Sequence, residues 1–506
     1  MRIRPESAAD FYKIGHIRQY PSGTEYVYSN FTPRASKYAP NLPGVFENKV
    51  VVFGIQGFVK WYLIDTWKRE FFDLPLETVL KRYQRRMYTS LGPNAVTSEH
   101  IAALHKLGYL PVKIKALPEG TKCPTKIPVL TITNTLPEFY WVVNFLETVM
   151  SAELWKVMTN ATTAYKYRLL LERYALETGG SQDFIQWQGH DFSFRGMSGI
   201  HDAAQTGAGH LLSFSGTDTI PALDYIDDFY HGEKFFVGGS VPATEHSVMC
   251  MGGELTEDQT FLRIMTEVYP TGVVSIVSDT WDFWRIMTEF VMKYREVILA
   301  RQPNALGLAK VVFRPDSGDP VKIICGDPDA PMDSPERKGA VECLWEAFGG
   351  TTNDKGYRTL NPRVGLIYGD SITLYRAKEI LQGLKDKGFA SDNVVFGIGS
   401  YTYQYVTRDA YGMAIKATHG VVRGIPREIY KNPKTDDGTK RSARGLLVVH
   451  SDWNKELYLQ DRANQAEETT GLLRTVFENG KLTVDEDIQT IRDRLFNRLV
   501  EKNNSF

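Results

Sequence analysis

The stretch Val311-Val-Phe313-Arg314-Pro-Asp316-Ser317-Gly318-Asp319-Pro320 is a short apolar run that stops abruptly at a charged turn. Similar runs, each ending in Gly, Ser, Thr or Asp, occur at His210–Phe214, Val273–Val277, Val364–Tyr368 and Val394–Phe396, and Met413–Lys416 is a further candidate. Continuous apolar strands are typical of a parallel sheet covered on both faces, and helix-like sequence between them predicts βα units. From about residue 185 onward we therefore expect an α/β fold with a barrel-like parallel sheet.

Polar residues follow each run, and in such a barrel the carboxyl ends of the strands meet at one rim, where ligands bind. The densest group is Arg314-Pro-Asp316-Ser317-Gly318. A guanidinium can bind a phosphate with two hydrogen bonds, and a carboxylate suits Mg²⁺ or a developing positive charge. Taken alone, this segment indicates a salt-bridged surface turn more readily than a site. Several runs in succession with Asp or Arg in their turns favour a shared active-site rim.

Other features carry weaker signals. Gly397-Ile-Gly-Ser400 is typical of a loop whose N–H groups approach a phosphate, although Tyr403 stands where a dinucleotide fingerprint has its third glycine. Arg408 and Lys416 are candidates to neutralise a phosphate, and the alternative is that they are solvated charges on a helix. His246 stands beside Glu245, and as a lone histidine it is more typical of a hydrogen-bonded structural residue. The H-E-x-x-H and G-x-S-x-G patterns of zinc enzymes and serine hydrolases are absent from the sequence.

The first third has a different pattern. Thr135-Leu-Pro-Glu138 has the form of a helix-capping box, and it predicts an apolar helical region that runs toward Gly179-Gly180. We divide the chain into residues 1–180, an irregular β-rich α+β layer with the helical region, residues 181–430, the β/α barrel, and residues 431–506, which we expect to pack on the first layer. The excursion Val321–Pro362, rich in Pro, Gly, Asp and Lys, is expected to be solvent-exposed.

Charge and cysteine content exclude several classes of function. The 506 residues include 59 Lys and Arg against 60 Asp and Glu, a net charge of -1 that disfavours nucleic-acid and membrane-surface binding. Four cysteines with no CxxC pair, an amino terminus without an apolar signal region and no long apolar stretch predict a cytoplasmic protein without a membrane span. An anionic ligand must therefore be bound by local basic residues.

These candidate groups share a demand for phosphates, Mg²⁺ and a stabilised cation, which is the demand of phosphoribosyl transfer. Loss of pyrophosphate from a ribosyl pyrophosphate develops oxocarbenium character at the anomeric carbon. Such a site needs basic groups and a metal on the leaving group, carboxylates near the ring and a flat slot for the incoming base. The acidic strand-end signature of the commoner phosphoribosyltransferases is missing, since Asp227-Asp228 follows no such strand. A barrel-type enzyme remains compatible with the chain.

Ordered motifs make the resemblance specific. They are Asp10-Phe-Tyr12-Lys13-Ile-Gly-His16 with Gln19-Tyr-Pro21, His190-Asp-Phe192-Ser-Phe-Arg195-Gly196, Gly216-Thr-Asp218-Thr, Ser240-Val-Pro-Ala-Thr-Glu-His246-Ser, Arg314-Pro-Asp316-Ser-Gly, Gly369-Asp370 and Thr407-Arg408-Asp409. Over nearly its whole length the chain resembles the nicotinamide phosphoribosyltransferase family. The resemblance implies a type II phosphoribosyltransferase barrel with a β-rich amino-terminal layer, in a homodimer whose active sites lie at the subunit interface. It also implies nicotinamide, phosphoribosyl pyrophosphate and ATP as substrates, with Mg²⁺ held mainly through the pyrophosphate.

The resemblance also implies roles for individual residues. Phe192 would stack on one face of the pyridine ring and Tyr12 of the other subunit on the opposite face. Asp218 would accept from the carboxamide NH₂, and Arg195 would donate to its oxygen. His246 would carry the phosphate through which ATP hydrolysis is coupled to product formation. The groups expected around the ribose and the phosphates are Arg314, Asp316, Asp279, Gly369, Asp370, Ser400, Arg408, Lys416 and Arg34, the last reaching across the dimer.

The sequence departs from the family pattern at two places, and three other functions compete with the one that the resemblance implies. Ser193 and Phe194 replace a glycine and a tyrosine beside the base slot, and Ser400-Tyr401-Thr402 replaces a glycine-rich run. The rivals are a nicotinate phosphoribosyltransferase, a catalytically silent nucleotide-binding protein on the same scaffold and, more remotely, a barrel glycoside hydrolase. Asp218 favours the amide over nicotinate, because a carboxylate substrate would meet a like charge.

Overall fold

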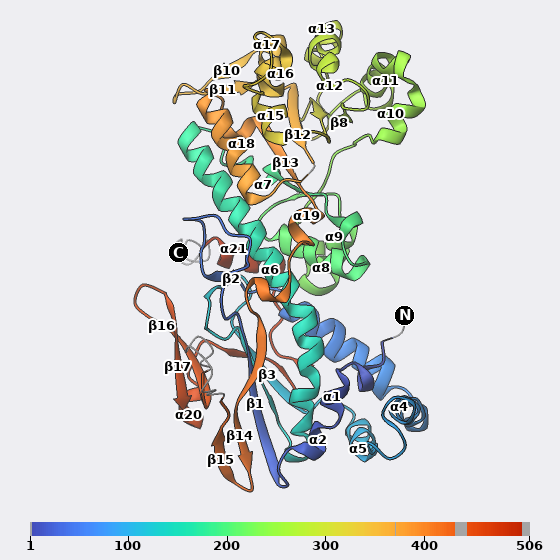
Figure 1. Ribbon diagram of the computed structural model, residues 1–506, viewed down its shortest axis with the longest axis vertical. Coiled ribbons are helices and arrows are strands. Elements are labelled where there is room, and N and C mark those ends of the chain that lie inside the picture. The colour runs from blue at the N-terminus through green and yellow to red at the C-terminus, as the bar shows by residue number, and fades with distance from the viewer. Residues whose placement is uncertain (1–2, 370, 431–442, 498–506) are drawn as a thin grey trace.

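A parallel six-stranded sheet forms the centre of the carboxyl-terminal two thirds of the computed structural model, which describes residues 3–369, 371–430 and 443–497. Its strand order is β7-β6-β13-β12-β9-β8, and Figure 1 labels β8, β12 and β13. The strands are β6 (Gly189–Asp191), β7 (Gly216–Thr217), β8 (Val273–Val277), β9 (Lys310–Arg314), β12 (Val364–Tyr368) and β13 (Val394–Ile398). Four of the predicted apolar runs therefore coincide with strands, and the α/β barrel class is confirmed.

An irregular segment joins the two outer strands of this sheet. On one side, the N–H of Gly239 donates to the carbonyl of Ser215 at 2.8 Å, and the N–H of Thr217 donates back to Gly239 at 3.0 Å. On the other side, the N–H of Ser275 donates to Pro242 and that of Thr244 donates to Ser275, both at 2.9 Å. Residues 239–244 thus close the barrel by backbone hydrogen bonds, without forming a regular strand.

One predicted strand is wrong. His210–Phe214 starts inside helix α8 (Ile200–Leu211) and continues into a turn, and β7 follows it by two residues. Burial explains the apolar composition, because Leu211, Leu212 and Phe214 pack in the core as a helix end and turn do. A short apolar run does not distinguish a buried helix end from a buried strand.

Helices cover the outside of the barrel. They include α9 (Ile220–Tyr230), α10 (His246–Gly252), α11 (Glu257–Arg263), α15 (Pro320–Cys325), α16 (Pro335–Lys338), α17 (Ala340–Phe348) and α18 (Leu374–Asp386). The expectation that 321–362 is a solvent-exposed excursion is wrong for its helices, because Ile324, Val341 and Leu344 are fully buried in the barrel core. The excursion supplies part of the helical layer and adds the small antiparallel pair β10 (Gly350–Thr352) and β11 (Arg358–Leu360).

A second sheet, antiparallel and seven-stranded, forms the amino-terminal layer. Its order is β15-β14-β1-β5-β3-β18-β19, from β1 (Thr24–Thr32), β3 (Val112–Ala116), β5 (Leu130–Asn134), β14 (Ala414–Val422), β15 (Ile425–Glu428), β18 (Arg474–Glu478) and β19 (Lys481–Leu482). The candidate run Met413–Lys416 leads into β14, so it belongs to this sheet and not to the barrel. Segments from both chain ends share the layer. The proposed bounds of 1–180, 181–430 and 431–506 stay a prediction.

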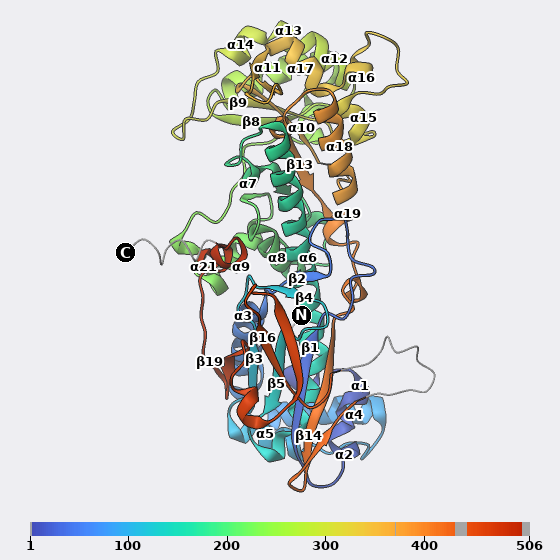
Figure 2. The same ribbon diagram turned by 90° about the vertical axis from the view of Figure 1, so that its left-hand side faces the viewer.

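The 38-residue helix α6 (Trp141–Thr178) runs from this layer to the barrel (Figures 1 and 2). It ends at Gly179, whose φ of +69° allows the left-handed termination predicted at the glycine pair. The predicted capping box is wrong, because the hydroxyl of Thr135 donates to Asn479 Oδ1 at 2.6 Å and caps no helix. The start of the helix is instead a 3₁₀ turn, η4 (Pro137–Phe139).

Shorter elements complete the amino-terminal layer: α1 (Phe11–Ile14), α2 (His16–Gln19), α3 (Ile55–Phe58), α4 (Leu76–Leu91), α5 (Glu99–Leu107), β2 (Lys49–Val51), β4 (Lys122–Pro124), β16 (Leu446–Ser451), β17 (Leu457–Ala463), α20 (Gln465–Glu468) and α21 (Ile488–Leu495). Among the described helices, none combines the length and the apolar character needed to cross a membrane. Cys123, Cys325 and Cys343 are buried free thiols, whereas Cys250 is exposed.

Candidate active site

The carboxyl ends of the barrel strands bring most of the predicted site residues to one rim. In order around the barrel, Asp218 follows β7, Ser240 lies on the closing segment, Asp279 follows β8, Arg314 ends β9, Gly369 follows β12, Ser400 follows β13 and Phe192 follows β6. These strands are neighbours in the sheet, so residues as far apart in the chain as Phe192 and Ser400 become neighbours at the rim.

Phe192 lies on a floor made by two glycines. A Cβ atom added to Gly397 would lie 2.4 Å from Cδ2 of Phe192, and one added to Gly369 would lie 3.2 Å from the same ring atom. The Gly369 position is also 3.2 Å from Oδ1 of Asp316. The absence of side chains at residues 369 and 397 therefore lets an aromatic face and a carboxylate lie side by side at the strand ends.

Asp218 lies next to His190, whose ring centroid is 4.8 Å from that of Phe192. Its Oδ1 accepts from Nε2 of His190 at 2.8 Å and from the hydroxyl of Ser240 at 2.5 Å. Burial acts to raise the pKa of Asp218, but the hydrogen bonds from His190 and Ser240 and the charge of Arg314 outweigh it, so the pKa falls below the ordinary 3.8. Asp218 is therefore ionised at neutral pH.

His246 begins α10 immediately after the closing segment. Its side chain is 47% exposed, and its Nε2 lies 3.1 Å from Oδ1 of Asp279, whose own side chain is only 6% exposed. Oδ2 of Asp279 accepts from the backbone N–H of Asp316 at 3.0 Å and from the hydroxyl of Ser317 at 2.6 Å. One carboxylate thus connects the histidine to the turn after β9.

Arg314 joins the closing segment to the same rim. Its Nη2 donates to the carbonyl of Thr244 at 2.7 Å, and its backbone N–H donates to the hydroxyl of Ser278 at 3.3 Å. The Nε atom is buried and has no hydrogen-bond partner within the described residues. A buried unpaired guanidinium N–H favours an acceptor supplied by a ligand.

Arg195 and Ser400 are also brought together. A Cβ added to Gly196 would lie 2.0 Å from Oγ of Ser400, so the loop after β6 lies directly against α19 (Ser400–Tyr403). Arg195 is exposed, and its side chain makes no hydrogen bond or ion pair within the described residues. The guanidinium is free to contact a ligand above Phe192.

Tyr12, Arg34 and Lys416 are not on this rim. Tyr12 lies on α1, and the neighbouring Lys13 donates from Nζ to Asn144 Oδ1 at 2.6 Å, near the start of α6. At the end of α19, the carbonyl of Tyr403 accepts at 3.1 Å from Nδ2 of Asn160, which lies near the middle of α6. Sixteen residues of helix separate the two contacts, or about 24 Å along its axis. Figures 1 and 2 both show α1 well apart from α19.

The basic residues from the two ends of the chain gather beside the seven-stranded sheet. Arg34 follows β1, and its Nε donates at 2.8 Å to the carbonyl of Gly412, in the turn that begins at Arg408. Lys416 is exposed on β14. Arg34 and Lys416 thus lie beside the seven-stranded sheet, whereas Tyr12 lies on α1. Asp370 lies outside the described residues.

No role was predicted for His190, which stands in a quoted motif, or for Gly397 as the floor of the aromatic wall. Ser240 also stands in a quoted motif, and no role was predicted for it. His190 lies on β6, two residues before Phe192, which directly follows that strand, and this spacing is the signal for two side chains on one face. No periodicity marks residues 239–244, since they form no regular strand.

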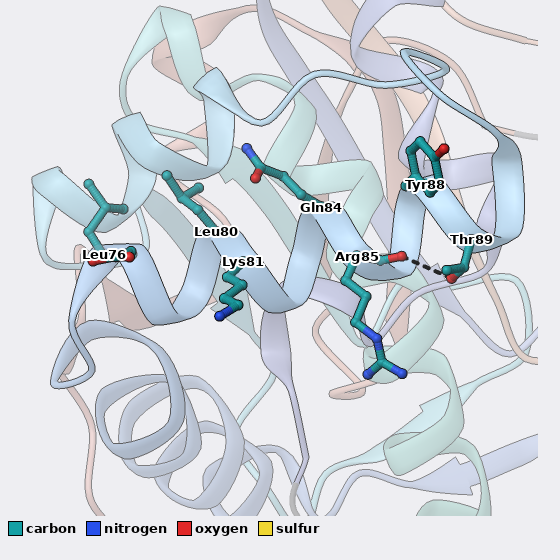
Figure 3. Close-up of a pocket in the computed structure, with 8 residues that line it drawn as sticks. Leu76, Leu80, Lys81, Gln84, Arg85, Tyr88 and Thr89 are labelled. Carbon is teal, nitrogen blue, oxygen red and sulfur yellow. Dashed lines mark hydrogen bonds between the residues drawn. The ribbon is translucent and has the colours of Figure 1, made fainter.

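A separate hollow of ≈ 930 Å³ runs along α4, far from the rim in sequence and in Figure 1. Figure 3 shows its lining, Leu76, Leu80, Lys81, Gln84, Arg85, Tyr88 and Thr89, all on a single helix. It contains none of the predicted site residues. An open face of one helix lacks the convergent polar groups of a ligand site.

Comparison with known proteins agrees with this geometry. Residues 187–481 match the nicotinate phosphoribosyltransferase (NAPRTase) family, and residues 6–114 match the N-terminal domain of nicotinamide phosphoribosyltransferase. A nicotinamide phosphoribosyltransferase of Acinetobacter baylyi is 59% identical over 98% of this chain and 98% of its own length. The chain belongs to the nicotinamide phosphoribosyltransferase family. It is therefore a phosphoribosyltransferase.

More distant relatives extend this family assignment. A nicotinamide phosphoribosyltransferase of Mycoplasma pneumoniae is 35% identical over 87% of this chain and 94% of its own length. Human nicotinic acid phosphoribosyltransferase has a similar crystal structure, with a TM-score of 0.55, 13% identity and coverage of 97% of this chain and 93% of that chain. A nicotinate-nucleotide pyrophosphorylase from Pyrococcus furiosus has a TM-score of 0.54 at 15% identity, with coverage of 99% and 97%. These two structures confirm the type II phosphoribosyltransferase fold.

Proposed function

We propose that this enzyme transfers the phosphoribosyl group of 5-phosphoribosyl 1-pyrophosphate to nicotinamide, giving nicotinamide mononucleotide and pyrophosphate in NAD salvage. The observation that carries the proposal is the ionised Asp218, which accepts at 2.8 Å from His190, whose ring centroid lies 4.8 Å from that of Phe192. A carboxylate accepts from the NH₂ of a carboxamide, whereas it repels the carboxylate of nicotinate. The aromatic face binds a flat heterocycle at low entropic cost.

The rim residues suit the chemistry of the transfer. The pyridine nitrogen forms a bond to the anomeric carbon as the bond from that carbon to the pyrophosphate oxygen breaks, and the electron pair leaves with pyrophosphate. Asp316, next to Phe192, is placed to stabilise the positive charge that develops on the ribose. Arg314 has a buried N–H that finds no partner among the residues that the structure describes, and it would bind a phosphate oxygen.

Mg²⁺ remains part of the proposal as a companion of the pyrophosphate. Within the described residues no group of three or more His, Cys, Asp or Glu side chains is arranged to hold a metal. Mg²⁺ commonly binds through one or two carboxylates together with substrate phosphates, and Asp316 is the rim carboxylate that fits this role. The ion would neutralise charge on the leaving group.

We propose further that ATP phosphorylates His246. The support is its exposed ring at the start of α10 and its contact from Nε2 to Asp279, which orients the imidazole and leaves Nδ1 as the nucleophile. In that step Nδ1 forms a bond to the γ-phosphorus and ADP leaves. Hydrolysis of the phosphohistidine returns the free imidazole and releases phosphate.

A homodimer with shared sites is supported by the separation of Tyr12 from the rim. Tyr12, 61% exposed, is about 24 Å along α6 from the end of α19, so it cannot reach Phe192 within one chain. A second copy placed head to tail would bring Tyr12, Arg34, Arg408 and Lys416 to the rim.

A cytoplasmic location is also proposed, supported by cysteines that are all free thiols.

A nicotinate phosphoribosyltransferase is the second candidate, because the family match over residues 187–481 carries that name. The purified protein should be incubated with Mg²⁺, phosphoribosyl pyrophosphate and, in parallel, nicotinamide, nicotinate or quinolinate. We expect pyrophosphate release, and a product with the mass of nicotinamide mononucleotide, only in the reaction that contains nicotinamide. Preference for nicotinate would support the second candidate, and no release with any base would support a silent nucleotide-binding protein.

A further inference from the structure

The two oxygens of Asp218 have different environments. Oδ1 receives two hydrogen bonds, from Nε2 of His190 at 2.8 Å and from Ser240 at 2.5 Å. No hydrogen bond reaches Oδ2 within the part of the chain that the structure describes. The protein therefore occupies one oxygen of this carboxylate and leaves the other available to a ligand.

The imidazole of His190 is itself held in place. A Cβ added to Gly216, its partner across the β6–β7 pair, would lie 2.7 Å from Nδ1. On another side the ring centroid lies 4.8 Å from that of Phe192. The side chain is only 11% exposed. His190 is thus wedged between the strand that precedes Asp218 and the aromatic wall of the site.

We propose that His190 is a positioning residue that sets the preference for an amide substrate. Its Nε2–H ties Oδ1 of Asp218, so that Oδ2 accepts from the carboxamide of a base stacked on Phe192. This inference rests on the proposed function. An imidazole N–H orients the carboxylate in a fixed direction, whereas a flexible ammonium would pair with it as a mobile point charge.

The test compares His190→Phe, which keeps the ring and removes the donor, with His190→Gln, which restores an N–H. At saturating phosphoribosyl pyrophosphate, we expect His190→Phe to raise the KM for nicotinamide by about tenfold, with a smaller change in kcat. The ratio of kcat/KM for nicotinamide over nicotinate should fall as well. His190→Gln should recover part of both losses.

A matched control removes an equivalent contact elsewhere. Nε2 of His201 on α8 lies 3.1 Å from Oε2 of Glu153 on α6, and this pair does not include Asp218, so His201→Phe should leave the KM for nicotinamide and the base preference unchanged. Gly216→Ala provides an independent variant, because its new methyl group must displace the ring of His190 without altering any donor. It should reproduce the rise in KM even if His190→Phe does not fold.

The outcomes separate this inference from the function on which it rests. If the unmodified enzyme uses nicotinamide but His190→Phe and Gly216→Ala keep its KM and base preference, the positioning role is wrong. If the unmodified protein transfers nothing to any base, the proposed function fails. Calorimetric titration with nicotinamide then decides the inference, since weaker binding by His190→Phe supports it and equal binding overturns it.

Discussion

Asp279 contacts His246 with one carboxylate oxygen and the turn after β9 with the other. Its Oδ1 lies 3.1 Å from Nε2 of the histidine, while its Oδ2 accepts from the backbone of Asp316 and the hydroxyl of Ser317. The residue proposed to accept a phosphate from ATP therefore shares a carboxylate with the loop proposed to bind the ribose phosphate. A change in the charge of His246 alters the strength of this contact directly.

His246→Ala is expected to abolish an acid-labile phosphate that forms with γ-labelled ATP, because the nucleophile is gone. Stimulation of transfer by ATP should be lost, with some basal transfer remaining. Asp279→Asn should reduce labelling by about tenfold, since the imidazole loses the partner that orients it. His450→Ala, which removes a histidine on β16 paired with Gln460, should label normally. Equal ATP stimulation in His246→Ala would contradict the phosphoenzyme.

Asp218→Asn should reduce the selectivity for nicotinamide over nicotinate by at least about tenfold, because the repulsion of a carboxylate substrate disappears. The measurement is the ratio of kcat/KM for the two bases. The pKa of Asp218 lies below the ordinary 3.8, so the site loses its negative charge only as the pH falls through that lowered value. Unchanged selectivity in Asp218→Asn would remove this residue from base recognition.

Gly397→Ala should raise the KM for nicotinamide by about tenfold or more, since a Cβ at that position would lie 2.4 Å from the ring of Phe192. Gly365→Ala on the neighbouring strand β12 is the control, because its Cβ would meet the flexible stem of Lys310 at 3.0 Å and Val312 at an ordinary contact distance of 3.6 Å. Steady-state kinetics with both variants tests the prediction. Similar KM values for the two would show that Phe192 does not contact the base.

The buried carboxyl group of Glu119 should make the stability of the protein depend on pH. Burial raises its pKa from 4.5 to about 7, although the N–H groups of Gln56 and Gly54 donate to its carboxylate. The folded protein then holds a proton that the unfolded chain releases above pH 4.5, so the free energy of unfolding falls as the pH rises toward 7, by roughly 3 kcal/mol. Glu119→Gln should remove this decline in denaturant titrations. Exposed Glu138→Gln should retain it, and identical slopes in all three proteins would refute the assignment.

Mixed dimers test the sharing of sites between subunits. Tyr12→Ala and Phe192→Ala should each lower kcat/KM for nicotinamide by about tenfold or more, because each removes one aromatic face of the slot. Unfolding and reassembling the two variants together should give about a quarter of the sites both rings, and activity should rise accordingly. No recovery, despite dimers in solution, would mean that Tyr12 does not complete the partner's site.

The sequence predicted the barrel well where strands are long enough to show a buried apolar run. Val273–Val277 and Val364–Tyr368 match β8 and β12 residue for residue. The first strands of the barrel were harder to predict, because β7 has only two residues and the helix end before it is equally apolar. The closing segment 239–244 pairs through isolated backbone bridges, which leave no alternation of side chains to detect.

The residues that meet at the rim were predicted better than the construction of the rim. Asp218, Arg314 and Phe192 stand in quoted motifs and Asp279 follows a predicted strand, and the barrel places all four at neighbouring strand ends. The contact of Asp279 with His246 joins two residues 33 positions apart in the chain, so local pattern does not reveal it. Positions such as Gly397 matter for the room they leave, which becomes visible only when the opposing ring of Phe192 is in place.

Helix α6 sets the distance between the two layers of one chain. Its 38 residues form a continuous rod of about 57 Å, anchored beside Tyr12 through Lys13 and beside α19 through Asn160. In a head-to-tail pair, the two α6 helices would run between the two catalytic centres. The length of α6 would then set the distance between the base slot that holds one chain's Phe192 and the slot to which the same chain contributes Tyr12.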